Sequence, residues 1–146
     1  MRTRNLLIFL LLFLSIGALV GGGAFLFFPN GFMDMSTEQM LANSPFTNFL
    51  IPGLILFTVL GVFPILIVWG LISKKGVKTF ETINIFRDMH WSWSFSIYVG
   101  FALIIWIFTQ VYILQDWIWL HFAYFYFGIL ILVVTLLKPI REMYRK

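Results

Sequence analysis

The sequence predicts an all-α membrane protein: a bundle of four transmembrane helices, with both termini on the cytoplasmic side and a short interfacial helix on the outer side. Three observations lead to this prediction. Of the 146 residues, 61% are hydrophobic and only 11% are charged, a balance that a soluble domain of this size cannot bury but a bilayer accepts. The apolar residues form four long uncharged runs. All basic residues lie outside these runs. We expect one membrane domain, residues 1–146.

The basic residues lie on one side of this four-span pattern. They precede the first run, separate the second from the third, and follow the fourth: Arg2, Arg4, Lys74, Lys75, Lys78, Arg87, Lys138, Arg141, Arg145 and Lys146. The connection 29–48 and the turn 115–116 contain no Lys or Arg. Basic loops beside membrane spans stay in the cytoplasm, so both termini are expected inside a plasma membrane. The net charge of +4 then reflects orientation and contact with anionic lipid, and we expect no nucleic-acid partner.

The first span is predicted over residues 6–28, because about 20 helical residues cross the hydrocarbon core. Within it, Gly17 and Gly21 form a small-xxx-small pair that permits close helix approach. Two interpretations are open: packing inside the four-helix bundle, which we favour, or the contact surface of a homo-oligomer.

The outer connection, residues 29–48, is expected to have local structure. Ser36 and Gln39 fit a capping box at the start of a short interfacial helix. Ser44 is expected to cap the second span, with Pro45 at its first helical position.

The remaining spans are predicted over residues 49–72, 93–114 and 117–137. Pro64 lies in the middle of the second span, so a kink is expected there, with a carbonyl about one turn earlier left without its partner. In the inner loop, three apolar residues about three apart suggest a helix lying on the membrane surface: Phe80, Ile83 and Phe86.

The four runs contain no Asp, Glu, Lys or Arg, and the chain has no cysteine. Proton-coupled transporters and small multidrug exporters depend on intramembrane charges, which this chain lacks. Thiolate chemistry and cysteine-ligated metals are excluded as well. His90 and His121 are expected about one span apart, which rules out a metal or haem shared between them. We therefore expect no metal site and no cofactor.

One polar group of residues remains as a candidate site. The third and fourth spans form a tight hairpin, so Gln110 and His121 are expected at similar depth below the outer surface. Tyr124 and Gly128 follow His121 on one helical face, and Trp106 lies one turn from Gln110. The sequence thus predicts a pocket lined by Trp106, Gln110, His121 and Tyr124, in which Gly128 leaves room.

A structural interpretation of the same residues is also open. Gln and His in apolar helices often hydrogen-bond each other across a hairpin, which contributes about 0.6–2 kcal/mol to helix association. We favour this structural tie over a ligand site, although polar residues inside membranes tend to be functional. Asp116, at the turn, could also reach His121.

Three stretches of the chain resemble a group of small, uncharacterised bacterial four-helix membrane proteins. They are Asn43-Ser-Pro-Phe-Thr-Asn-Phe-Leu-Ile-Pro-Gly-Leu-Ile-Leu56 at the second span, Trp106-Ile-Phe-Thr-Gln110, and Leu120-His-Phe-Ala-Tyr124 with Gly128. The first stretch is the most specific. The resemblance covers most of residues 31–137, implies a bacterial plasma-membrane protein, and supplies no activity.

Three functions fit these observations. The favoured one is a non-enzymatic accessory or binding component that works through contacts with membrane lipid, a membrane-protein partner or further copies of itself. The second is a binder or carrier of an apolar lipid or quinone-like ligand in the outer-leaflet pocket. The third is a lipid-modifying enzyme that uses His121 as a base. We rank the enzyme last, since no carboxylate lies within the spans.

Overall fold

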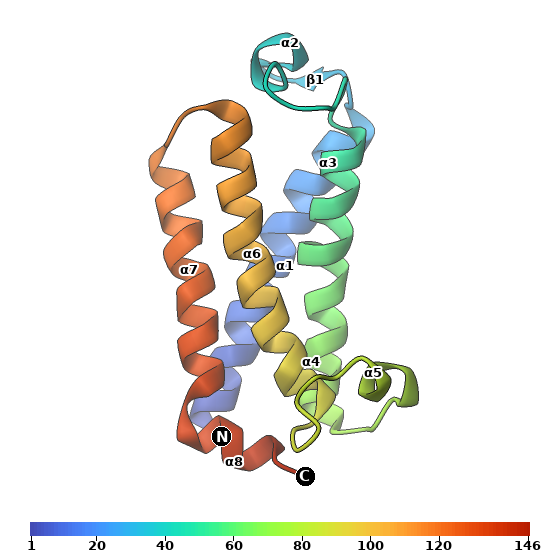
Figure 1. Ribbon diagram of the computed structural model, residues 1–146, viewed down its shortest axis with the longest axis vertical. Helices are drawn as coiled ribbons and strands as arrows, with labels where there is room; N and C mark the ends of the chain where they lie inside the picture. The colour runs from blue at the N-terminus through green and yellow to red at the C-terminus, as the bar shows by residue number, and fades with distance from the viewer.

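The computed structural model describes all residues from Met1 to Lys146 and is mostly helical (Figure 1). Four helices are long and apolar enough to cross a membrane: Arg2–Phe27, Leu50–Ser73, Trp91–Leu114 and Trp119–Leu136. The prediction of a four-helix membrane bundle is therefore confirmed as far as helix number, length and composition are concerned. The observed spans agree with the predicted ones to within a few residues at each end.

The helical elements follow the chain in order. They are α1 (Arg2–Phe27), α2 (Thr37–Met40), α3 (Leu50–Ile55), the π-helix η1 (Leu56–Val62), α4 (Phe63–Ser73), α5 (Lys78–Thr82), α6 (Trp91–Leu114), α7 (Trp119–Leu136) and α8 (Lys138–Tyr144). Two short antiparallel strands, β1 (Gly31–Phe32) and β2 (Met35–Ser36), form a small hairpin after α1. The second span consists of α3, η1 and α4 in one continuous helix.

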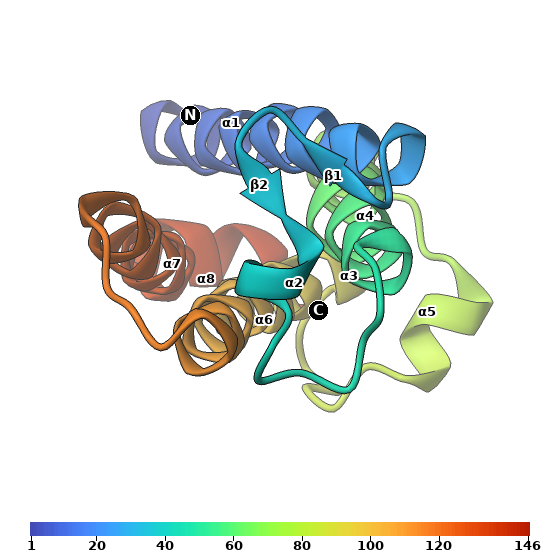
Figure 2. The same cartoon turned by 90° about the horizontal axis from the view of Figure 1, so that it is seen from above.

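The bundle has two distinct ends (Figure 1). The β hairpin and α2 lie at one, here called the hairpin end; α5, α8 and both termini lie at the other, the termini end. Viewed from above, α1 is strongly inclined to the other spans and crosses one side of the bundle (Figure 2). Along this course α1 packs on the second span and on α7, while α6 packs mainly on α7.

The tightly packed core lies mostly in the half of the bundle towards the termini end. Its completely buried side chains include Leu11, Leu71, Trp91, Phe95 and Ile131. An aromatic cluster extends this core towards α5, where the Phe80 ring lies 4.7 Å from that of Trp91 and 5.6 Å from that of Phe95, measured between centroids. The half of the bundle at the hairpin end is packed less densely, and the candidate site lies there.

Pro64 is accommodated by a change in helix type. The seven residues before α4 form the π-helix η1, in which the Phe63 N–H bonds the Thr58 carbonyl five residues earlier. A π segment is one of the few ways for a helix to absorb a missing i→i−4 bond. The Gly61 carbonyl, just before Pro64, accepts a hydrogen bond from Ser15 Oγ of α1 at 2.5 Å. The helix before Pro64 is thus irregular, and a side chain of another span bonds a carbonyl beside it, while the expected kink itself stays a prediction.

One local prediction in the loops was wrong, and a second is confirmed only in part. Ser44 does not cap the second span: its hydroxyl bonds the Leu41 carbonyl and receives the Phe46 N–H, and the span begins only at Leu50. There Asn48 Oδ1 accepts the Leu50 N–H. Ser36 is the N-cap of α2, but its side chain makes no capping hydrogen bond.

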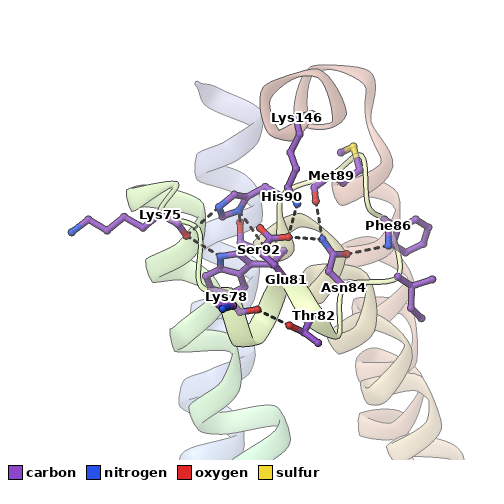
Figure 3. Close-up of polar contacts among 12 residues, drawn as sticks. Lys75, Lys78, Glu81, Thr82, Asn84, Phe86, Met89, His90, Ser92 and Lys146 are labelled. Carbon is purple, nitrogen blue, oxygen red and sulfur yellow. Dashed lines mark hydrogen bonds and ion pairs between the residues drawn. The ribbon is translucent and has the colours of Figure 1, made fainter.

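The surface helix predicted around Phe80, Ile83 and Phe86 is limited to α5, which ends at Thr82. The buried side chain of Asn84 breaks the helix by bonding to nearby backbone. Its amide donates to the Met89 carbonyl at 2.8 Å, and its Oδ1 accepts the Phe86 N–H at 3.0 Å (Figure 3). Phe80 packs against the core and the Phe86 ring lies edge-on to that of Trp93, while Ile83 is exposed.

The termini end is held together by polar contacts between distant segments (Figure 3). Lys146 Nζ forms an ion pair with Glu81, and the backbone N–H of Lys146 bonds the Asp88 carbonyl. The His90 N–H bonds the Tyr144 carbonyl at 2.8 Å. Burial alone would raise the pKa of Glu81, but hydrogen bonds from Lys146 and Asn84 hold it below its usual value. These contacts fix the chain after α8 against the loop before α6.

His90 is the N-cap of α6. Its Nδ1 accepts the Ser92 N–H at 3.3 Å and lies 2.8 Å from Ser92 Oγ. Since Nδ1 accepts, the neutral ring carries its proton on Nε2, which lies 3.2 Å from the Lys75 carbonyl. The same carbonyl receives the Trp91 Nε1–H at 2.9 Å. Burial lowers the pKa of His90, so the neutral ring is the form that caps α6.

Candidate functional site

A cavity of about 230 Å³ lies inside the hairpin half of the bundle. Four elements form its wall: α1, η1, α6 and α7. The side chains that line it are mostly apolar, among them Leu14, Phe25, Leu60, Leu103 and Leu120. The predicted residues Trp106, Gln110, His121 and Tyr124 all belong to this wall. The structure therefore brings the four residues together, as their spacing along the hairpin suggested.

His121 is held in one orientation by the backbone of its own helix start. At the third position of α7, its Nδ1 accepts the N–H of Ile118, the N-cap residue, at 3.3 Å. The Trp117 ring stands edge-on to the imidazole, with 6.4 Å between centroids. Because a backbone N–H can only donate, Nδ1 must be the acceptor and the neutral ring carries its proton on Nε2. His121 is only 5% exposed, yet Nε2 has no hydrogen-bond partner in the protein and keeps accessible surface.

Gln110 and His121 do not form the predicted structural tie. The side chain of Gln110 makes no hydrogen bond to any protein group, and His121 bonds only to Ile118. Asp116 likewise makes no hydrogen bond to His121. The two polar side chains thus line one cavity at similar depth without satisfying each other.

The Tyr124 side chain of α7 reaches α1 at Gly17 and forms the wall of the cavity there. A Cβ added to Gly17 would lie 2.9 Å from Tyr124 Oη, so the absence of a side chain at Gly17 makes room for the hydroxyl. Oη has no hydrogen-bond partner in the protein and is not sealed from solvent. Gly21, one turn further, also lines the cavity and faces Leu56 at 3.6 Å. The glycine pair of the first span therefore shapes the cavity, a role that the small-xxx-small pattern did not predict.

The closest approach of α1 to the second span involves the neighbouring glycine. A Cβ on Gly22 would lie 2.6 Å from the Phe57 backbone nitrogen. On the other side of the contact, a Cβ on Gly53 would lie 3.2 Å from the Gly22 carbonyl oxygen. This packing within one chain supports the interpretation that the glycines of the first span serve the bundle itself.

Gly128 was predicted to face the cavity, but it lies at the contact between α6 and α7. It does not line the cavity; a Cβ there would lie 2.9 Å from Ile104 Cγ1 and 3.2 Å from the Gly100 carbonyl oxygen. Gly128 and Gly100 let α6 and α7 cross closely below the cavity. The prediction that Gly128 leaves room in the pocket was wrong, because the residue one turn below Tyr124 faces α6 rather than α1.

A second, smaller cavity of about 120 Å³ adjoins the first towards the hairpin end. The two share three wall residues, Phe25, Trp106 and Gln110. The rest of the smaller wall is apolar except for Thr109, and Met40, Leu41 and Phe46 of the hairpin-end loop form part of it. No feature of the sequence indicated this cavity, since its wall depends on how the loop folds over the ends of α3 and α6.

Protein-family models, curated proteins and solved structures contain no match to this chain. The resemblance to the group of bacterial four-helix proteins stays a prediction.

Proposed function

We propose that the chain is a multi-pass plasma-membrane protein with both termini in the cytoplasm, and that it acts as a non-enzymatic binding component. In this proposal it holds one largely apolar molecule with a polar head in the cavity between α1, η1, α6 and α7. Membrane lipid surrounds the bundle and is the source from which such a molecule enters.

The observation that carries this proposal is a group of polar side chains that line one cavity and make no hydrogen bond to one another: Trp106, Gln110, His121 and Tyr124. Inside a bilayer, leaving a polar group without a hydrogen-bond partner costs on the order of several kcal/mol. Most polar groups elsewhere in the spans are satisfied; Trp93 Nε1, for example, donates to the Thr135 carbonyl at 2.8 Å. Four unpartnered groups around one space are the expected signature of a site that a ligand completes.

The orientation is supported by the charges at the two ends of the bundle. The basic residues gather at the termini end, at the start of α1, on α5 and α8, and in the segments that follow α4, α5 and α8. The hairpin end carries three acids and no base: Asp34, Glu38 and Asp116. The positive-inside rule then assigns the termini end to the cytoplasm. The cavity would lie at the depth of the outer leaflet, and α2 at the outer interface.

Cysteine accessibility tests this orientation, because the chain has no cysteine of its own. Single cysteines at Glu38 and Gln115 should react with an impermeant thiol reagent in intact cells. A cysteine at Lys78 should react only after the cells are opened. The reverse pattern would overturn the orientation but not the binding site.

Native mass spectrometry of the protein, released gently from its own membrane, tests binding. Wild-type protein should carry one stoichiometric adduct. His121→Phe keeps a ring in the wall but removes the Nε2–H donor, so the adduct should be lost or strongly depleted. Tyr126→Phe is the matched control, since Tyr126 is 64% exposed on the outer face of the same helix. A bare chain, or the same loose lipids on all three proteins, would refute the proposal.

A further inference from the structure

We propose that the molecule held in the cavity is a quinone-type ligand: a neutral ring with carbonyl oxygens and an apolar side chain. This inference rests on the proposed binding function and specifies its ligand. Three features of the two adjoining cavities lead to it: the hydrogen-bonding character of the polar groups, the absence of charge, and the apolar extension.

The polar groups of the wall are predominantly donors. Trp106 Nε1–H can only donate. His121 must also donate, because the Ile118 N–H occupies its Nδ1 at 3.3 Å and leaves the proton on Nε2. The Tyr124 hydroxyl and the Gln110 amide can each donate as well. A ligand that presents acceptors, such as carbonyl oxygens, can satisfy all four groups, whereas a ligand that presents only donors would leave two of them unpaired.

No charged side chain lines either cavity. An anionic head in such surroundings would lose its hydration without gaining a counter-charge, which is strongly unfavourable. The nearest basic residues along the chain lie at the termini end, beyond the tightly packed core. A phosphate-bearing lipid head is therefore a poor occupant, although its ester carbonyls are acceptors. The wall fits a neutral head.

The smaller cavity provides for the apolar part of the ligand. It opens from the same wall residues, Trp106 and Gln110, and is lined by side chains such as Leu41, Phe49 and Pro52. Its volume of about 120 Å³ and its mostly apolar wall suit the first part of an alkyl or prenyl chain. A head in the larger cavity, bonded by His121 and Tyr124, would direct its chain past Trp106 into this space.

The test uses a benzoquinone that carries a ten-carbon chain. The protein is stripped of ligand and reconstituted in nanodiscs of neutral phospholipid, and binding is followed by the rise in unfolding temperature as the quinone is added. Two further probes are the alkylbenzene with the same chain, which lacks acceptors, and phosphatidylglycerol, which has an anionic head. The variants are Tyr124→Phe, which removes one hydroxyl, His121→Phe, and the control Tyr126→Phe.

We expect the alkylquinone to stabilise the wild type and Tyr126→Phe equally. Tyr124→Phe should bind about two- to tenfold more weakly, the effect of one neutral hydrogen bond, and His121→Phe should bind more weakly still. The alkylbenzene should bind at least about tenfold more weakly than the quinone, having no acceptor to offer.

Four outcomes would overturn the inference. If the alkylbenzene stabilised as well as the quinone, or if phosphatidylglycerol alone stabilised in a manner dependent on His121, the cavity would still bind a ligand, and only the ligand class would be wrong. If a native adduct dependent on His121 were found while the quinone bound to no protein, the binding function would stand and the quinone would be excluded. The absence of both a native adduct and quinone binding would remove both proposals together.

Discussion

Tyr124 of α7 and Gly17 of α1 meet at the wall of the cavity, with Tyr124 Oη 2.9 Å from the position that a Cβ on Gly17 would take. The hydroxyl can occupy this place only because residue 17 has no side chain. A glycine in the first span thus determines where a polar group in the fourth span lies. The cavity depends on contacts between segments more than a hundred residues apart.

The first prediction concerns this contact. In Gly17→Ala the added methyl group must displace the Tyr124 hydroxyl, while the protein still folds because the far end of a side chain can move. We expect ligand affinity to fall about two- to tenfold, as in Tyr124→Phe, with at most a small change in unfolding temperature. Gly23→Ala is the control, because a Cβ there has only an ordinary contact, 3.9 Å from Phe57 Cε2. Equal ligand binding by both variants would contradict the prediction.

The second prediction concerns the hydrogen bond between α1 and the π-helix. Ser15→Ala removes the donor to the Gly61 carbonyl and leaves that carbonyl without a side-chain partner in a buried position. We expect a loss of about 1 kcal/mol in the free energy of unfolding. Ser94→Ala is the matched control: Ser94 is equally buried, but its hydroxyl has no partner. Denaturation of both variants in detergent should show destabilisation for Ser15→Ala alone, and equal loss in the two would argue against this hydrogen bond.

The third prediction concerns pH and His90. Burial lowers the pKa of His90 in the folded protein below the unfolded value of about 6.5. The folded state therefore binds the proton more weakly, so stability is fully present above about pH 6.5 and falls as the pH is lowered through the folded pKa. Protonation also removes the acceptor that caps α6 through Ser92.

Thermal unfolding between about pH 8 and about pH 5 measures this effect. His90→Asn keeps a side chain that can cap a helix but does not titrate in this range. We expect the variant to lose less stability than the wild type on acidification. An identical decline in both proteins would assign the pH dependence to other groups.

The fourth prediction concerns the loop between α5 and α6. Asn84→Ala would leave the Met89 carbonyl and the Phe86 N–H without their side-chain partner. We expect faster hydrogen exchange and faster proteolysis across residues 83–89, with the spans unchanged. Thr82→Ala serves as the control, since its hydroxyl bonds only to the Lys78 carbonyl of its own helix. Equal protection of the loop in both variants would show that Asn84 does not organise it.

Helix number, span bounds and the group of four wall residues could be predicted from sequence, since they depend on hydropathy and on helical spacing within one tight hairpin. Trp106 and Gln110 are one turn apart, as are His121 and Tyr124, and the short turn fixes their relative depth. These relations are local and follow from helix geometry alone.

The features that the sequence did not predict depend on contacts between distant segments or on competing local bonds. Gly128 was assigned to the cavity, but the rotation of α7 turns it towards Gly100. The favoured bond between Gln110 and His121 is missing: the only hydrogen bond of the imidazole is at Nδ1, which accepts the Ile118 N–H. Ser44 bonds within its own turn instead of capping α3. Hydropathy carries no information about such competition.

Nitrogen NMR of protein labelled with ¹⁵N only in histidine tests the central claim most directly, because the chain contains just two histidines. We predict that His121 is neutral with its proton on Nε2, and that the Nε2 signal moves when the alkylquinone is added. The His90 signals, from the termini end, should stay in place and serve as the internal control. A proton on Nδ1 of His121, or a His121 signal that does not change while the quinone binds, would contradict the account.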